Sequence, residues 1–277
     1  MSSRPSHLIV ATMVVASIAG CSLLVETSGL RGGEEQDASV EIDARDGKIE
    51  VGTRDSGGAV PPPCTDGPTR FCDDFDDSNP GDKWTTSFRE RGNLTYDKLG
   101  LSAPHAFSGE LVSGAGDGVA ALQKEFAGPP GTIGCAFDLK IGRVGKDGET
   151  VAFEIQTYPA TSNGPRVVGT HAVSLLNLNG TATWSLEEYQ SSAGGQPVVN
   201  RSTPVGDLPT GSWIHVAIAW TTSSVKLTTN GSIATLDALK TPTDSVRRGV
   251  SLGITFAAAT VQAGSLSFDN VDCTMAQ

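Results

Sequence analysis

The amino-acid sequence predicts an all-β domain, a two-sheet antiparallel sandwich of jelly-roll type. Three observations favour this fold: apolar and polar residues alternate with a period of two in several segments, turn signals separate those segments, and no long segment has helical periodicity. The 277 residues include 33 Gly and 15 Pro, a composition typical of many turns. We expect about a dozen strands after residue 64.

The clearest strand is residues 133–141, where the odd positions from Ile133 to Ile141 are apolar and polar or small residues intervene. A period of two indicates a strand with one buried face. Residues 151–156 and 214–220 show the same alternation, and Asn230-Gly231 favours a two-residue hairpin between 225–227 and 233–235. Further strands are expected at 71–75, 83–88, 119–126, 167–176, 181–188, 250–256 and 266–271.

The N-terminus is predicted to be a signal peptide of residues 1–20. Arg4 precedes an apolar segment, 8–18, that carries no charge and is followed by small residues before Cys21, the layout of a secretory signal. An uncleaved membrane helix is the alternative, because the apolar run extended through Val25 reaches about the 18 residues that a span needs.

Residues 21–63 are predicted to form a disordered acidic tether, and residues 64–277 the folded domain. No aromatic residue precedes Phe71, and residues 22–63 carry nine acidic against four basic side chains and close on Pro61-Pro62-Pro63. Low hydrophobicity with net negative charge disfavours a packed core.

The net charge of −11 argues against a nucleic-acid partner, because an acidic chain repels phosphate backbones. The only basic doublet of the domain is Arg247-Arg248, and we interpret both side chains as exposed surface.

Beyond Cys21, four cysteines remain, and an even number in an exported chain indicates two disulfides. Of the three pairings, we favour Cys64 with Cys72 and Cys135 with Cys273. The alternative is a zinc site, but the sequence has neither Cys-x-x-Cys spacing nor a nearby His pair.

The run Ile18-Ala19-Gly20-Cys21 resembles the lipobox of bacterial lipoprotein precursors. This resemblance implies that Cys21 carries lipid chains, each buried methylene contributing roughly 0.8 kcal/mol to membrane binding. The expected location is the bacterial cell envelope, with the protein lipid-anchored to a membrane and the domain in the periplasm or on the cell surface.

The run Gly211-Ser212-Trp213-Ile214-His215-Val216-Ala217, followed by 225–227 and Asn230-Gly231, resembles the laminin G-like domains of the concanavalin A-like superfamily. Phe71–Phe75 and Phe268–Val271 are similar to that superfamily's first and last strands, which lie side by side. The resemblance implies a structural role for Trp213 and His215. It also implies a structural calcium ion, for which Asp74 and Asp269 are candidate ligands; otherwise no cofactor is expected.

Glycoside hydrolases that share this sandwich carry Glu-x-Asp-x-x-Glu on one strand, because a period of two places both carboxylates on one face. The nearest approximation begins at Glu154 and has Gln156 and Pro159 where carboxylates should be. Glu187 and Glu188 are adjacent, so they point to opposite faces of a strand. No catalytic residue is therefore predicted, and we expect that the domain is not an enzyme.

The leading functional expectation is a non-catalytic sandwich that binds carbohydrate or another extracellular ligand. Its candidate ligand-binding residues are Tyr158, Trp184, Tyr189 and Glu154, because aromatic faces offer contact area to sugar rings. The alternatives are a glycan-active, glycoside hydrolase-like enzyme on the same fold and an adhesion or structural envelope protein that binds other proteins.

Acylation of Cys21 is directly testable. Wild-type protein is expected to incorporate labelled palmitate and partition into detergent, whereas Cys21→Ala should lose both properties because the thioether cannot form. A Cys21→Ala variant that still incorporates the label would contradict the lipid anchor.

Overall fold

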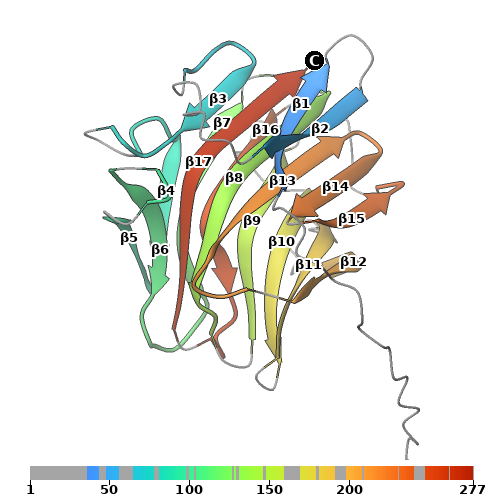
Figure 1. Cartoon of the computed structure of the whole chain (residues 1–277). Coiled ribbons are helices and arrows are strands. Elements are labelled where there is room, and N and C mark those ends of the chain that lie inside the picture. Colours follow the sequence, from blue (N-terminus) through green and yellow to red (C-terminus); the bar gives the residue numbers. More distant parts are fainter. Residues whose placement is uncertain are drawn as a thin grey trace, which may run out of the picture. The chain divides into compact units, whose positions relative to one another are not determined.

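The computed structural model describes residues 65–77, 81–97, 100–102, 104–126, 128, 131–145, 148–158, 169–178, 181–190, 198–207, 209–229, 231–239, 247–261 and 263–276, together with the strand pairing of residues 36–43 and 48–55. Every regular element in these residues is a β-strand, and the strands pair antiparallel (Figure 1). No helix in the described ranges has the length and hydropathy needed to span a membrane. The all-β prediction is confirmed.

One sheet has seven strands in the spatial order β12-β11-β10-β9-β16-β7-β4. Its strands are β4 (Thr86–Glu90), β7 (Gly118–Phe126), β9 (Gly148–Tyr158), β10 (Gly169–Leu178), β11 (Thr181–Gln190), β12 (Val198–Asp207) and β16 (Arg247–Ala257). Neighbours such as β9 and β16 are distant in sequence, so the chain crosses repeatedly between the two layers.

The second sheet has eight strands, in the order β15-β14-β13-β8-β17-β6-β5 with β3 also paired to β17. Its strands are β3 (Arg70–Asp73), β5 (Gly92–Asp97), β6 (Ala106–Leu111), β8 (Thr132–Arg143), β13 (Trp213–Thr221), β14 (Ser224–Thr229), β15 (Ser232–Asp237) and β17 (Gly264–Ala276). β3 and β17 lie side by side, as the family resemblance implies.

The predicted hairpin connects β14 to β15. Thr229 pairs with Ser232, which leaves a two-residue loop, and Gly231 has φ 85°. A positive φ at this position is what a type I′ turn requires.

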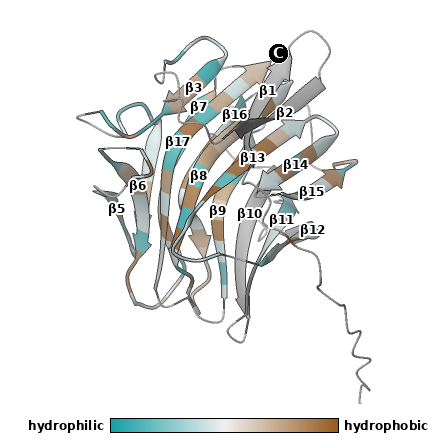
Figure 2. Ribbon diagram, in the orientation of Figure 1, coloured by the Kyte–Doolittle hydropathy of each residue, from teal (hydrophilic) through white to brown (hydrophobic). Residues whose placement is uncertain are grey.

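The hydrophobic core lies between the inner faces of the two sheets. Hydrophobic and hydrophilic residues alternate along the central strands (Figure 2), and the apolar set faces inward. Phe137 of β8 stacks on Phe153 of β9 with ring centroids 5.0 Å apart, which joins the layers directly. Each fully buried side chain of this size contributes about 1.5–3 kcal/mol to folding.

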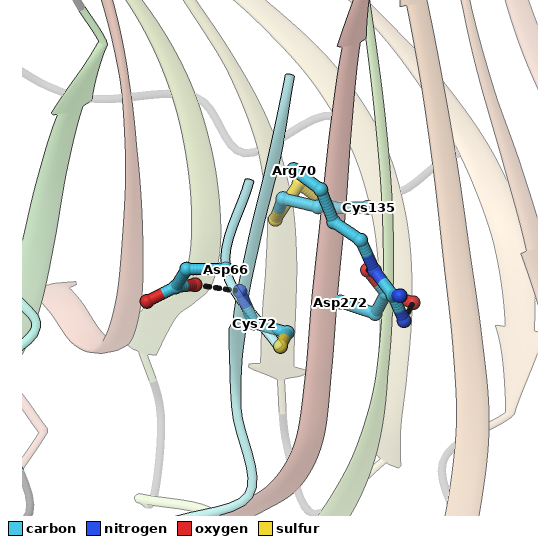
Figure 3. Close-up of a disulfide and its surroundings, with 6 residues drawn as sticks. Asp66, Arg70, Cys72, Cys135 and Asp272 are labelled. Carbon is cyan, nitrogen blue, oxygen red and sulfur yellow. Dashed lines mark hydrogen bonds and ion pairs between the residues drawn. A yellow bond between two sulfur atoms is a disulfide. The ribbon is translucent and has the colours of Figure 1, made fainter. Parts of the chain in front are cut away.

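The predicted Cys135–Cys273 disulfide is confirmed, and it joins directly paired residues of β8 and β17 (Figure 3). Cys72 is also disulfide-bonded, but its predicted partner Cys64 lies outside the described residues. Beside it, Arg70 donates two hydrogen bonds to Asp272 at 2.9 and 2.7 Å, so the domain's first strand is tied to its last by side chains as well as backbone.

The sequence did not predict three strands of the described domain: β5, β6 and β12. β6 buries five of its six residues and β12 shows no plain alternation, so neither has a clear strand signal. β5 does alternate, with Leu94 and Tyr96 half-buried between exposed Asn93 and Thr95, but over few residues.

Two further strands lie within the segment predicted to be a disordered tether. β1 (Gln36–Asp43) pairs with β2 (Lys48–Asp55), with Val40 opposite Val51 and Ile42 opposite Ile49. Their aliphatic residues recur at a period of two, a pattern typical of strands, and the disordered tether stays a prediction. The signal peptide and Cys21 lie outside the described residues, and the boundaries 1–20, 21–63 and 64–277 stay a prediction.

The prediction that Arg248 is exposed is wrong. Its side chain is 1% exposed, and its guanidinium lies 4.0 Å from the ring centroid of Trp220, across the core from β16 to β13. Burial lowers the pKa of Arg248 to about 10, so the side chain remains charged at neutral pH and the aromatic face offsets part of the desolvation cost.

Removing the Cys135–Cys273 disulfide should strongly destabilise the domain. The bond closes a separation of 138 residues, and the chain-entropy model assigns about 5 kcal/mol to a loop of that size. We expect Cys135→Ala/Cys273→Ala to lower the free energy of unfolding by about 3–5 kcal/mol in urea titrations. Unchanged stability relative to oxidised wild type would contradict this.

Candidate functional site

Three of the four predicted ligand-binding residues lie on one surface, the face of the seven-stranded sheet that points away from the eight-stranded sheet. We call this surface the outer face. Glu154 and Tyr158 of β9 and Tyr189 of β11 alternate along their strands with core residues such as Ile155 and Leu186. These three side chains therefore face away from the core. Tyr158 is nevertheless only 3% exposed, so its predicted role of offering a ring face to a sugar is wrong, and its hydroxyl belongs to a hydrogen-bond network instead.

The fourth residue, Trp184, is a correction. It is 3% exposed, belongs to the hydrophobic core, and donates from Nε1 to the carbonyl of Asp207 at 3.2 Å. Trp184 precedes Glu187 by three residues, so the alternation of β11 places it on the opposite face. It cannot offer a ring face to a sugar.

A β-bulge in β9 adds a carboxylate to the outer face. In the pairing of β9 with β10, Phe153 lies opposite Val173 and Val151 opposite Ser174, so Ala152 is an extra residue without a register partner. In a regular strand, Glu149 and Glu154 are five residues apart and face opposite sides. The extra residue reverses the alternation and brings Glu149 to the same face as Glu154.

The neighbouring strand β16 is irregular at the same level. Leu252 pairs with Phe153 and Phe256 with Val151, so three residues of β16 bulge out opposite Ala152. Gly253 in this bulge has φ 123°, a conformation that favours glycine. The bulge directs Thr255 toward β9, where its hydroxyl donates to the carbonyl of Val151 at 3.3 Å and also hydrogen-bonds Glu154.

A network of hydrogen bonds supports Glu154 from the other side. Gln156 Nε2 donates to the Glu154 carboxylate at 2.5 Å, and Tyr158 Oη donates to Gln156 Oε1 at 2.5 Å. Gln123 of β7 donates from Nε2 to both Gln156 Oε1 and Tyr158 Oη at 2.6 Å. Because Gln123 and Tyr158 are buried, this network holds the Glu154 side chain in a defined position.

The pKa of Glu154 is raised above its ordinary value, first by burial and then by the negative charge of Glu149. Hydrogen bonds from Gln156 and Thr255 lower it in part. A raised pKa favours the protonated form of a carboxyl group, which is the form that a general acid needs.

Glu149 is held by a second group of polar side chains. Tyr189 Oη hydrogen-bonds the carboxylates of both Glu149 and Glu187. Glu187 also accepts from Ser185 Oγ at 2.7 Å and Ser202 Oγ at 3.2 Å. The hydroxyl of Tyr189 therefore bridges the carboxylates of Glu149 and Glu187.

The adjacent residue Glu188 faces the opposite way, as the alternation predicts. It is fully buried and accepts a hydrogen bond from Arg201 Nε at 3.0 Å. Glu187 and Glu188 thus lie on opposite faces of β11 and do not form a pair.

The candidate calcium ligands lie elsewhere. Asp269, on β17, is fully buried and accepts from the backbone N–H groups of Ser102 and Asn270 at 2.8 Å, and burial raises its pKa to about 6. Asp74 accepts from the backbone of Asp76 at 3.4 Å. Across the described ranges, no group of three or more His, Cys, Asp and Glu side chains could hold a metal, so calcium stays an expectation without a ligand set.

His215 has the interstrand position expected of a structural residue. Its Nδ1 lies 3.0 Å from Asp138 Oδ1, and Asn270 Nδ2 donates to Asp138 Oδ2 at 2.8 Å. These contacts join β13, β8 and β17 on the outer side of the eight-stranded sheet.

Sequence reasoning missed several residues of the outer-face site: Glu149, Gln123, Thr255 and Ser251, whose hydroxyl accepts from Gln123 at 3.5 Å. Ser251 and Thr255 could have been found, because both alternate with the apolar residues of the predicted strand 250–256. Glu149 could not, because its placement depends on a bulge that no sequence signal marked, and Gln123 is followed by a lysine, which obscures the alternation.

Comparison with known proteins supports the fold. No family model matches the sequence, and no curated protein matches it. Among solved structures, the chain is similar to Cellulose induced protein, Cip1, with a TM-score of 0.50 and 15% identity over 74% of this chain and 96% of that one.

Other similar structures are mostly alginate lyases. The marine PL7 alginate lyase AlyA1 from Zobellia galactanivorans has a TM-score of 0.45 and 11% identity, covering 63% of this chain and 79% of its own. Alginate lyase vAL-1 from Chlorella virus has a TM-score of 0.46 and 10% identity, covering 69% and 93%. The chain has a jelly-roll β-sandwich fold.

The expectation that the domain is not an enzyme is contradicted by these structures, most of which are named as lyases. That expectation relied on the absence of a Glu-x-Asp-x-x-Glu motif and of a nucleophile motif, and neither motif detects carboxylates that a bulge brings together. Identities this low establish a shared fold alone, so any reaction has to be argued from this chain's own residues.

The stability of Glu154→Gln relative to wild type should increase as the pH rises. The pKa of Glu154 is raised above its ordinary 4.5, so the folded state binds its proton more tightly than the unfolded chain does. Stability contributed by this proton is present at low pH and is lost as the pH rises through the folded-state pKa. Glutamine has no such proton and can still accept from Gln156.

The measurement is urea unfolding of both proteins at about pH 4 and about pH 7.5. The stability of Glu154→Gln minus that of wild type should increase between these values, while Glu110→Gln, an exposed change on β6, should show no such increase. A stability difference that does not change with pH would show that folding does not raise the pKa of Glu154.

Proposed function

We propose that this protein is a glycan-cleaving enzyme whose active site is the outer face of the seven-stranded sheet. The observation that carries the proposal is the bulge at Ala152, which places Glu149 and Glu154 on the same face of β9. Cleavage of glycosidic bonds by paired carboxylates needs two such groups on one surface, one of them protonated.

Glu154 is assigned as the general acid. Burial and the charge of Glu149 both raise the pKa of Glu154, which favours the protonated form that can donate to the leaving glycosidic oxygen. Gln156 and Thr255 hydrogen-bond the same group and stabilise the carboxylate that remains after the proton has left.

Glu149 is assigned as the second carboxylate, with Tyr189 positioning it. In hydrolysis the bond between the anomeric carbon and the leaving oxygen breaks, a water oxygen bonds to that carbon, and the water proton passes to Glu149. The hydrogen bond from Tyr189 fixes Glu149 with respect to β9.

The same proposal places the domain outside the cytoplasm, anchored to the bacterial envelope through Cys21. The Cys135–Cys273 disulfide supports export, because such bonds persist in oxidising compartments. Polysaccharide substrates are also extracellular, so an anchored enzyme would meet them there.

Single amide substitutions test the assignment. Because general acid–base groups typically contribute 10²–10⁴-fold, Glu154→Gln and Glu149→Gln should each lower the rate of glycan cleavage at least about 100-fold. The measurement is release of reducing ends from a broad polysaccharide panel, with Glu110→Gln as the charge-matched control.

Two outcomes would refute the proposal. The first is wild-type protein, folded by circular dichroism, that cleaves no member of the panel. The second is full activity in both Glu154→Gln and Glu149→Gln.

A further inference from the structure

The charges of the outer face have one predominant sign. On β7, β16, β9 and β11, the alternation places five ionisable side chains among the described residues on this face: Glu125, Glu149, Glu154, Glu187 and Arg247. Four are acidic and one is basic. Glu154 is the proposed proton donor, so the negative charges are those of Glu125, Glu149 and Glu187. Lys124 and Arg248, the other bases of these strands, point inward, over Phe71 and Trp220.

The single base of this face is already engaged. Arg247 Nη1 lies 3.2 Å from Glu125 Oε2, and both side chains are partly buried. An anionic ligand would have to compete with Glu125 for this guanidinium, at the cost of leaving that carboxylate without its partner.

The hydrogen-bond donors of the site are also directed at protein acceptors. The Gln123 amide donates to Gln156 and Tyr158, and the Gln156 amide donates to Glu154. The hydroxyl of Tyr189 and those of Ser185 and Ser202 are directed at carboxylates.

Hydrogen-bond acceptors predominate among the polar atoms that the outer face can offer to a ligand. A carboxylate has about four lone-pair sites and no hydrogen, so Glu149 and Glu187 present acceptors and no donor to a ligand. The complement of an acceptor-rich, negative surface is a ligand that supplies O–H or N–H donors and carries no negative charge.

We infer that the glycan acted on at this site is non-anionic: a polysaccharide rich in free hydroxyl or amino groups and without carboxylate or sulfate groups. This inference deepens the proposed function and rests on it. It is independent of the names of the similar structures, several of which act on alginate, an anionic polymer.

Electrostatics supplies the expected discrimination. The Debye length is about 30 Å at 0.01 M salt and about 3 Å at 1 M. A polyanion approaching Glu125, Glu149 and Glu187 is therefore repelled at low salt, and the repulsion is screened at high salt. A neutral chain should be nearly insensitive to salt.

The experiment measures cleavage and binding of length-matched oligosaccharides from a neutral glycan, an amino glycan and a polyuronate, at low and high salt. At low salt, wild type should cleave and bind either the neutral or the amino glycan about tenfold or more better than the polyuronate. High salt should reduce this ratio. Equal or better use of the polyuronate overturns the inference and leaves the proposed function intact. Failure with every class overturns the proposed function, and the inference with it.

A charge-matched pair of variants locates the effect. Glu125→Gln/Glu187→Gln removes two outer-face charges and releases Arg247, so its relative affinity for the polyuronate should increase about tenfold. Glu110→Gln/Asp117→Asn removes the same charge from exposed positions outside the site and should change this ratio less than about twofold. An equal increase in both variants would assign the discrimination to net charge and overturn the role of the outer face.

Discussion

Burial of the two inner sheet faces against each other is the constraint on which this structure depends. Each central strand can direct only every second side chain into the core, so β8 contributes Phe137 and Leu139 to it while Asp138 points to the other face. The sheets approach closely near Gly109 of β6, where a Cβ atom would come within 2.4 Å of the Ala120 carbonyl oxygen of β7. A larger residue there would force the layers apart.

Several polar side chains are buried by the same packing and need partners within the protein. Asp73 is 1% exposed, and it accepts from Trp84 Nε1 at 2.7 Å and from the backbone N–H of Phe75 at 3.0 Å. Burial is the main cause that raises the pKa of Asp73, and these donors offset it in part. The bond to Phe75 also explains how a phenylalanine is held at φ 57°.

The candidate site lies where the regular alternation fails. Both neighbours of β9 lose register beside Ala152, so the local sheet departs from ideal geometry at the position that carries Glu149 and Glu154. Bulges weaken the pairing of strands, and they are found where a side chain must be redirected. The network from Gln123 to Tyr158 compensates by fixing the side chains that the irregular backbone presents.

The class of fold, the strands that alternate clearly and the Asn230-Gly231 hairpin could be predicted from the sequence, because they follow from periodicity and turn chemistry. The number of cysteines predicted two disulfides, and the pairing of Cys135 with Cys273, one of three alternatives, was established by the register of β8 and β17. The sequence placed Tyr158, Glu154 and Tyr189 without indicating what joins them. Only the tertiary structure decided that Trp184 and Arg248 are buried, since neither strand's partner across the core can be read from local sequence. Only the tertiary structure placed Glu149 beside Glu154, because a bulge is created by the register of neighbouring strands, and one extra residue reverses every side chain beyond it.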